Sequence, residues 1–148
     1  MREETYPLKS KGSATTFEFI SEGPKGAIKK RVEYQQIIED VDFYNLAFGD
    51  INAITGKIDD KVISDNGDTK KVLATVAATV FEFINKHPNA IIYVEGSNLA
   101  RTRLYRMGIS NNLEEINEHF IVSGLLRDDD WRIYQRNINY SAFLIRKK

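Results

Sequence analysis

The chain has 148 residues, of which 42% are hydrophobic and 28% are charged, a composition typical of one globular domain that excludes an intrinsically disordered chain. Its 21 basic residues balance its 21 acidic residues, so no overall positive charge draws the protein to nucleic acid or to an anionic membrane. The sequence contains no cysteine, which excludes disulfides, thiol catalysis and thiolate metal sites.

The sequence predicts one globular domain over residues 1–148, because no repeat, low-complexity tract or linker divides the chain. Residues 1–12 are the one stretch that is a candidate for disorder. The segment from Met1 to Pro7 lacks the apolar core of a signal peptide. No run approaches the roughly 18 apolar residues of a membrane-spanning helix. We therefore expect a cytoplasmic protein that does not bind membranes.

The first half of the chain is expected to be antiparallel β structure. Residues 14–22 and 28–38 are rich in β-favouring residues and flank the Gly-Pro-Lys-Gly turn at 23–26, which predicts a hairpin. A third strand is predicted over residues 42–48. After a turn rich in Asp, Asn and Gly, a fourth strand is predicted over residues 58–63.

The second half is predicted to begin with a helix over residues 69–86, where apolar residues recur at helical spacing behind turn-forming and N-capping residues. A short apolar strand is predicted over residues 91–94. A second helix follows the turn Gly96–Asn98. Asn112, with Glu115 three residues later, fits the capping box of a third helix.

The tail returns to β structure, with strands predicted over residues 120–126, 131–135 and 140–146 and an acidic turn at 128–130. The predicted fold class is therefore α+β. We expect an antiparallel sheet of about six or seven strands, with one long and two shorter helices packed on one face.

The candidate binding site lies where the 91–94 strand ends and the second helix begins. A helix N-terminus leaves its first backbone N–H groups unpaired and carries a partial positive charge, which attracts anions. The opening turns of this helix also carry arginines. We predict an anion-binding site formed by Ser97, Asn98, Arg101, Arg103 and Arg106.

A helical wheel divides these arginines into two groups. Arg103 and Arg106 lie about 60° apart, where they can grip one phosphate or carboxylate together. Arg101 lies beyond the other edge of the apolar face of the helix, nearer the turn. That face consists of Ala100, Leu104 and Met107. The alternative is a structural role, in which the arginines bond to nearby glutamates or cover the sheet with their stems.

Other patterns in the sequence support a site less well. Arginines and aromatic residues alternate after residue 126, as in nucleic-acid-binding sheets, but the adjacent acidic turn at 128–130 repels a phosphate backbone. These residues are Arg127, Trp131, Arg132, Tyr134, Arg136 and Tyr140. The aspartates between residues 50 and 68 lack the spacing of a calcium loop, and the two histidines do not form a metal-spaced pair. We assign no catalytic residue, no metal site and no cofactor.

Four blocks of the sequence resemble a family of short bacterial proteins of unknown function. The blocks are Gly12–Phe19, Tyr44–Asp50, Asn66–Val80 and Arg101–Arg106. The resemblance extends over nearly the whole chain, from about Tyr6 to Arg146. It implies a single complete domain in a bacterial cytoplasm, and it brings no activity, cofactor or catalytic residue.

The sequence favours a non-enzymatic binding module that recognises an anionic partner, such as nucleic acid, a nucleotide or a phosphorylated ligand. One alternative is a phosphate-directed enzyme, such as a ribonuclease-like toxin, in which Glu95 or Asp68 acts as the general base beside the arginines. Another alternative is a structural homo-oligomer or a protein-interaction adaptor that uses an exposed strand edge or an aromatic face.

Overall fold

The computed structural model describes residues 3–59, 62 and 64–148. In chain order its elements are β1 (Lys9–Lys11), β2 (Thr16–Gly23), β3 (Gly26–Gln36), β4 (Phe43–Ile51), β5 (Ile58–Asp59), α1 (Thr69–Lys86), β6 (Ile91–Val94), α2 (Leu99–Asn111), α3 (Leu113–His119), β7 (Phe120–Leu125), β8 (Trp131–Ile133) and β9 (Ala142–Lys147).

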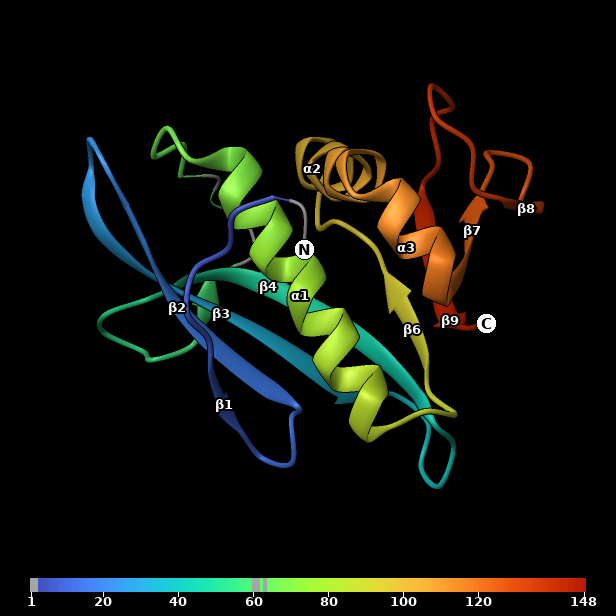
Figure 1. The fold of residues 1–148 in the computed structure, drawn as a ribbon, viewed down its shortest axis with the longest axis horizontal. Coiled ribbons are helices and arrows are strands. Elements are labelled where there is room, and N and C mark those ends of the chain that lie inside the picture. The colour runs from blue at the N-terminus through green and yellow to red at the C-terminus, as the bar shows by residue number, and fades with distance from the viewer. Residues whose placement is uncertain (1–2, 60–61, 63) are drawn as a thin grey trace.

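All of these strands belong to one sheet, in the order β1-β2-β3-β4-β6-β9-β7-β8, with β5 paired to β4 (Figure 1). Neighbouring strands are antiparallel except β4 and β6, which are parallel. The predicted α+β class is confirmed. The described sheet has nine strands, more than the six or seven expected, partly because no strand was predicted at β1.

The three helices cover one face of the sheet, with α1 lying across its centre (Figure 1). α1 has the predicted bounds. Its apolar side packs on the core-facing residues of the strands, which include the fully buried Phe17, Phe48 and Phe143. The core is therefore a single layer between the sheet and the helices.

The core-facing positions of three adjacent strands change from apolar to polar towards one end of the sheet. Along each strand these positions read Phe17, Phe19, Ser21 in β2, then Tyr34, Val32, Lys30 in β3, then Leu46, Phe48, Asp50 in β4. The register aligns the change in β3 and β4, because Lys30 lies opposite Asp50. In β2 the change comes one core-facing position later, because Phe19 lies opposite Lys30 and Ser21 lies opposite Ile28. Polar groups from separate strands therefore meet at this end of the core.

The β2–β3 hairpin is confirmed, with Gly23 paired to Gly26 across the turn. The predicted strand over 58–63 is seen as β5, and residues 60, 61 and 63 lie outside the described residues. None of the helices in the described part of the chain combines the length and the apolar character needed to cross a bilayer.

The capping box predicted at the start of α3 is wrong. Asn112 lies between α2 and α3, and its side chain makes no capping bond to α3. Its Nδ2 instead donates to the carbonyl of Gly108, 2.8 Å away, and so closes the last turn of α2. Asn112 is the single residue between the two helices, and its side-chain amide bonds to α2, the helix that ends there. Leu113 and Ile116 of α3 and Phe120, which follows it, are buried.

The buried face of α2 differs from the apolar face suggested by the sequence. The buried residues are Arg101, Tyr105, Gly108 and Ile109. Ala100 and Met107 are exposed. The buried residues are on the side of α2 that contacts α1, where Gly108 lies against the side chain of Leu73. The contact between the two helices decides which face of α2 is buried, because the apolar pattern of α2 is weak.

Candidate functional site

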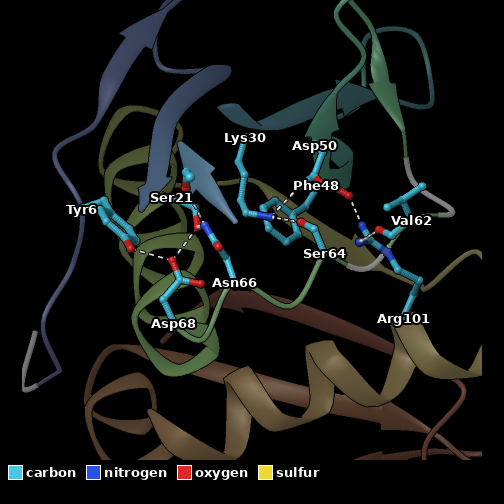
Figure 2. Close-up of polar contacts among 11 residues, drawn as sticks. Tyr6, Ser21, Lys30, Phe48, Asp50, Val62, Ser64, Asn66, Asp68 and Arg101 are labelled. Carbon is cyan, nitrogen blue, oxygen red and sulfur yellow. Dashed lines mark hydrogen bonds and ion pairs between the residues drawn. The ribbon is translucent and has the colours of Figure 1, made fainter. Parts of the chain in front are cut away.

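A group of polar side chains gathers at the polar end of the sheet, beneath the start of α1 (Figure 2). We call it the polar cluster. Its members are Tyr6, Ser21, Lys30, Asp50, Ser64, Asn66, Asp68 and Arg101. Buried polar groups are the informative departures in an otherwise apolar core, so the cluster is the candidate functional site of this protein.

Lys30 is buried within the polar cluster, with 4% of its surface exposed. Its Nζ donates to Asp50 Oδ1 at 2.5 Å and to Ser64 Oγ at 3.0 Å, and it lies 5.8 Å from the centre of the Phe48 ring. The β3–β4 register places Lys30 and Asp50 opposite each other. The ion pair is therefore built by the sheet and is internally neutral.

Asp68 occupies the N-cap position of α1, yet its side chain does not cap the helix. Its Oδ2 accepts hydrogen bonds from the Tyr6 hydroxyl and from Ser21 Oγ, both at 2.5 Å (Figure 2). Burial, together with the hydrogen bond to this carboxylate, raises the pKa of Tyr6. The first turn of α1 contains no acidic residue, so the carboxylate of Asp68 at the N-cap position is the negative charge nearest the positive end of the dipole among the described residues.

Asn66 joins the loop before α1 to the β2–β3 turn. Its Oδ1 accepts from the Lys25 backbone N–H at 2.7 Å, and its Nδ2 donates to the Gly26 carbonyl at 2.9 Å and to Ser21 Oγ at 3.2 Å. Gly23 lies so close to the Asn66 backbone that a Cβ atom there would collide with it. These contacts fix the loop that carries Asp68.

Arg101 is the most unusual member of the polar cluster, because it projects from α2 into the core with only 3% of its surface exposed. Its guanidinium donates to the carbonyls of Phe48 and Val62 and lies over the rings of Phe48 and Tyr105. Within the described residues, no carboxylate lies within ion-pair distance of it. Among the described residues, its charge is thus surrounded by carbonyls and rings.

The position of Arg101 follows from the edge of β4. β6 pairs with β4 at Phe43–Asn45, and β5 pairs with it at Asp50 and Ile51. The carbonyl of Phe48 lies between these two pairings. The Arg101 guanidinium bonds to that carbonyl, so it supplies a donor between the two described strand pairings of β4.

A pocket of about 390 Å³, including its open mouth, lies between α1, α2 and the polar end of the sheet. Its polar lining includes Lys30, Asp50, Ser64, Asp65, Asp68, Thr69 and Arg101. Asp50 is paired with Lys30. Asp65 Oδ1 accepts from the Gly67 N–H, and Asp68 Oδ2 accepts from Tyr6 and Ser21. Besides Lys30, the positive features towards the pocket are the start of α1 and the Arg101 charge.

The structure brings only one of the predicted anion-binding residues into this pocket. Asn98 caps α2, because its Oδ1 accepts from the Arg101 backbone N–H at 2.9 Å. Ser97 and Arg103 are exposed, and Arg106 Nη1 bonds to Asn139 Oδ1 on the outer side of α2. The pocket lining contains Arg101 but not Ser97, Asn98, Arg103 or Arg106.

The other residues of the polar cluster were not predicted as a site, although the sequence contained a signal for three of them. In each of β2, β3 and β4 the apolar alternation is broken by one polar residue, at Ser21, Lys30 and Asp50. The break at Lys30 is the clearest, because a lysine lies between Ile28 and Val32 on the same face. Only the strand register shows that Lys30 and Asp50 lie opposite each other and that Ser21 lies one core-facing position further along β2.

Several of the arginines and aromatic residues after residue 126 have partners within the fold. Tyr134 and Tyr140 are buried and pack on Phe143, so they present no open aromatic face. Arg132 bonds to Asp130, and Arg136 bonds to the Ser110 carbonyl. Over the part of the chain that the structure describes, no group of His, Cys, Asp and Glu side chains is arranged to hold a metal ion.

Glu95 and Asp68 were the two carboxylates considered as a general base. Glu95 is exposed and accepts a hydrogen bond from the Tyr93 hydroxyl at 3.1 Å. Asp68 lines the same pocket as Arg101, where its Oδ2 is held by two hydroxyl groups. Of the two, only Asp68 is placed beside the buried arginine.

Comparison with known proteins identifies a family. The chain matches no curated protein and no solved structure. A family model described as a family of unknown function, DUF6934, matches residues 2–148, which is nearly the whole chain. The chain therefore belongs to the DUF6934 family of unknown function.

Proposed function

We propose that this protein is a small binding module that recognises an anionic group, such as the phosphate of a nucleotide, a nucleic acid or a phosphorylated ligand. We further propose that it acts in a bacterial cytoplasm, in keeping with the family that its sequence resembles. The observation that carries the proposal is the buried charge of Arg101, which has carbonyls and aromatic rings around it but no described carboxylate within ion-pair distance.

A buried guanidinium without a counter-ion is costly, because carbonyl dipoles satisfy its N–H groups but do not neutralise its charge. An anion in the adjacent pocket supplies that neutralisation. The start of α1 faces the same pocket through Thr69, and it lacks both a side-chain cap and an acidic residue in its first turn. Both features favour a negative ligand at one point.

The outer arginines extend the same preference to larger partners. Arg103 is exposed on α2, and Arg106 is held beside it by Asn139. A polyanion whose phosphate enters the pocket can place further phosphates near these side chains, where each pairing adds a salt-dependent contribution to affinity.

The test is whether inorganic phosphate, pyrophosphate, nucleotides or short RNA and DNA bind to the wild-type protein at low salt. Binding is measured by titration calorimetry and by the shift in melting temperature. We expect at least one of these probes to bind, with an affinity that falls as salt rises. Arg101→Met removes the buried charge and should abolish binding. Arg103→Met, the matched change on the exposed side of the same helix, should retain binding to inorganic phosphate.

A second variant covers the case in which Arg101→Met does not fold. Leu104 lines the pocket and is only half-buried, so Leu104→Glu places a carboxylate at the pocket wall without removing a bond of the polar cluster. It should abolish phosphate binding by repulsion. If no probe binds the wild type at low salt, or if Leu104→Glu binds phosphate as the wild type does, the pocket is not the anion site.

A further inference from the structure

The two outer edges of the sheet differ in chemistry. The edge strand β1 carries Lys9 and Lys11, and charged residues such as lysine protect an edge from pairing with other chains. The opposite edge strand, β8, has one charged residue, Arg132, between Trp131 and Ile133, which are 38% and 66% exposed. An edge strand whose exposed side chains are mostly apolar is a template for pairing with another strand.

The backbone of β8 presents its free hydrogen-bonding groups at these two residues. The Asp130 carbonyl accepts from the Leu126 N–H, and the Tyr134 N–H donates to the Val122 carbonyl, so these positions point towards β7. In an antiparallel ladder the pattern alternates from residue to residue. The N–H and C=O groups of Trp131 and Ile133 therefore point outwards, away from the described strands.

We propose that β8 is a dimerisation edge, where a second copy of this chain pairs antiparallel about a two-fold axis through Arg132. In this register Trp131 forms a hydrogen-bonded pair with Ile133 of the partner subunit, and the same pair recurs across the axis. Both side chains lie on the sheet face that the helices leave uncovered. An aromatic residue opposite a β-branched residue is a favourable cross-strand pair.

The charges at the two ends of β8 fit this register. An antiparallel pairing centred on residue 132 brings the acidic turn at 128–130 towards residues 134–136 of the partner subunit, so that Asp128 lies near Arg136 of the partner subunit. The two copies of Arg132 face each other at the axis. Each is already bonded to its own Asp130, with Nε 2.6 Å from Oδ2, which offsets their repulsion.

The first test is the mass of the wild-type protein in solution, measured by sedimentation and light scattering from micromolar to millimolar concentrations. We expect a concentration-dependent dimer. Ile133→Lys introduces the lysine that protects β1 and should weaken dimerisation by roughly tenfold or more. The control is Ile54→Lys, which changes a residue that is 94% exposed in the loop between β4 and β5 and should leave the dimer unchanged.

The second test checks the register itself. Asp128→Arg and Arg136→Asp should each weaken the dimer, and the double variant should restore it, because the swapped charges face each other again. A wild-type monomer at every concentration would overturn the proposal. So would a dimer that Ile133→Lys leaves intact, since another surface would then hold the two copies together. Neither measurement depends on the anion pocket.

Discussion

Lys30 and Arg101 are charged side chains buried in this protein, each beside a partner that the fold supplies. The strand register supplies the partner of Lys30, and a backbone carbonyl at the edge of β4 is the partner of Arg101. Lys30 faces Asp50 because β3 and β4 align them, and Arg101 bonds to the Phe48 carbonyl between the described pairings of β4 with β6 and with β5. Each residue is costly to bury alone. Their burial therefore depends on particular neighbours and not on local sequence preference.

Glu18 shows how a charge on the outer face of the sheet contributes to stability. Arg31 donates to its Oε2 from Nη2 at 2.7 Å and from Nε at 2.9 Å, and Lys11 lies 3.4 Å from its Oε1. The hydrogen bonds from Arg31 hold the pKa of Glu18 below its ordinary value. The folded state thus favours the ionised carboxylate more than the unfolded state does.

We predict that Glu18→Gln lowers the free energy of unfolding at pH 7 by about 1–2 kcal/mol, the scale of a hydrogen bond to a charged group. The contribution of Glu18 is present above its unfolded pKa and is lost as pH falls through its lower folded pKa. The difference in unfolding free energy between variant and wild type should therefore shrink as pH falls below about 4.5, as measured by urea unfolding. Glu22→Gln, at an exposed position on the same strand, should leave the pH dependence unchanged.

At the scale of elements, the connection from β4 to β6 decides the topology. Two parallel neighbouring strands require a crossover connection, and α1 lies on the path between β4 and β6. α1 is therefore held against the sheet by both of its ends. The expected antiparallel sheet is interrupted at this one place, where a long helix rather than a turn joins the two strands.

The glycines at the two ends of α2 are predicted to respond in opposite directions. A Cβ at Gly96 would collide with the backbone nitrogen of Thr102, so Gly96→Ala should destabilise the protein by about 3 kcal/mol or more. At Gly108 an added Cβ meets Leu73 Cδ2 at 3.4 Å, an ordinary contact. Gly108→Ala should stabilise the protein by about 0.5–1 kcal/mol through helix propensity.

Thermal and urea unfolding measure the stability of the Gly96→Ala and Gly108→Ala variants against the wild type. Both variants replace glycine with alanine. The pair serves as its own control, because each variant adds one methyl group to a buried or half-buried glycine around the same helix. Equal destabilisation by both changes would contradict the close packing of the turn before α2.

At the scale of the whole molecule, the N-terminal segment holds α1 to the sheet. The Tyr6 N–H donates to Thr75 Oγ1 at 2.9 Å, its ring stacks on Phe19, and its hydroxyl bonds to Asp68. One residue near the chain start thus contacts the middle of α1, the start of α1 and β2. It closes the side of the core that would otherwise lie open beside β1.

We predict that Tyr6→Ala lowers the free energy of unfolding by roughly 3–5 kcal/mol, since it removes a buried ring together with its polar contacts. Tyr6→Phe should cost only about 1 kcal/mol, the scale of a single hydrogen bond. Urea unfolding of the two variants separates the ring from the hydroxyl. If Tyr6→Ala is as stable as the wild type, the N-terminal segment does not contribute to the folded core.

The candidate site was predicted only in part, for a reason visible in α2. The sequence pointed to the turn at Gly96–Asn98 and to Arg101, and Asn98 does cap the helix. The helical wheel placed Arg101 beyond the edge of a predicted apolar face. Two residues of that face, Ala100 and Met107, are exposed in the structure. A wheel assumes that the apolar side packs inwards, whereas the α1–α2 contact at Gly108 selects the side that carries Arg101.

The sequence by itself determined the α+β class, the bounds of α1 and the β2–β3 hairpin, because hydrophobic period, turn residues and helix-start residues are local properties. The tertiary structure alone decided that Lys30, Asp50, Asp68 and Arg101 line one pocket. That meeting depends on the register of three strands, the β4–β6 crossover and the face on which α2 packs. None of these is local, so no window of the sequence contains them.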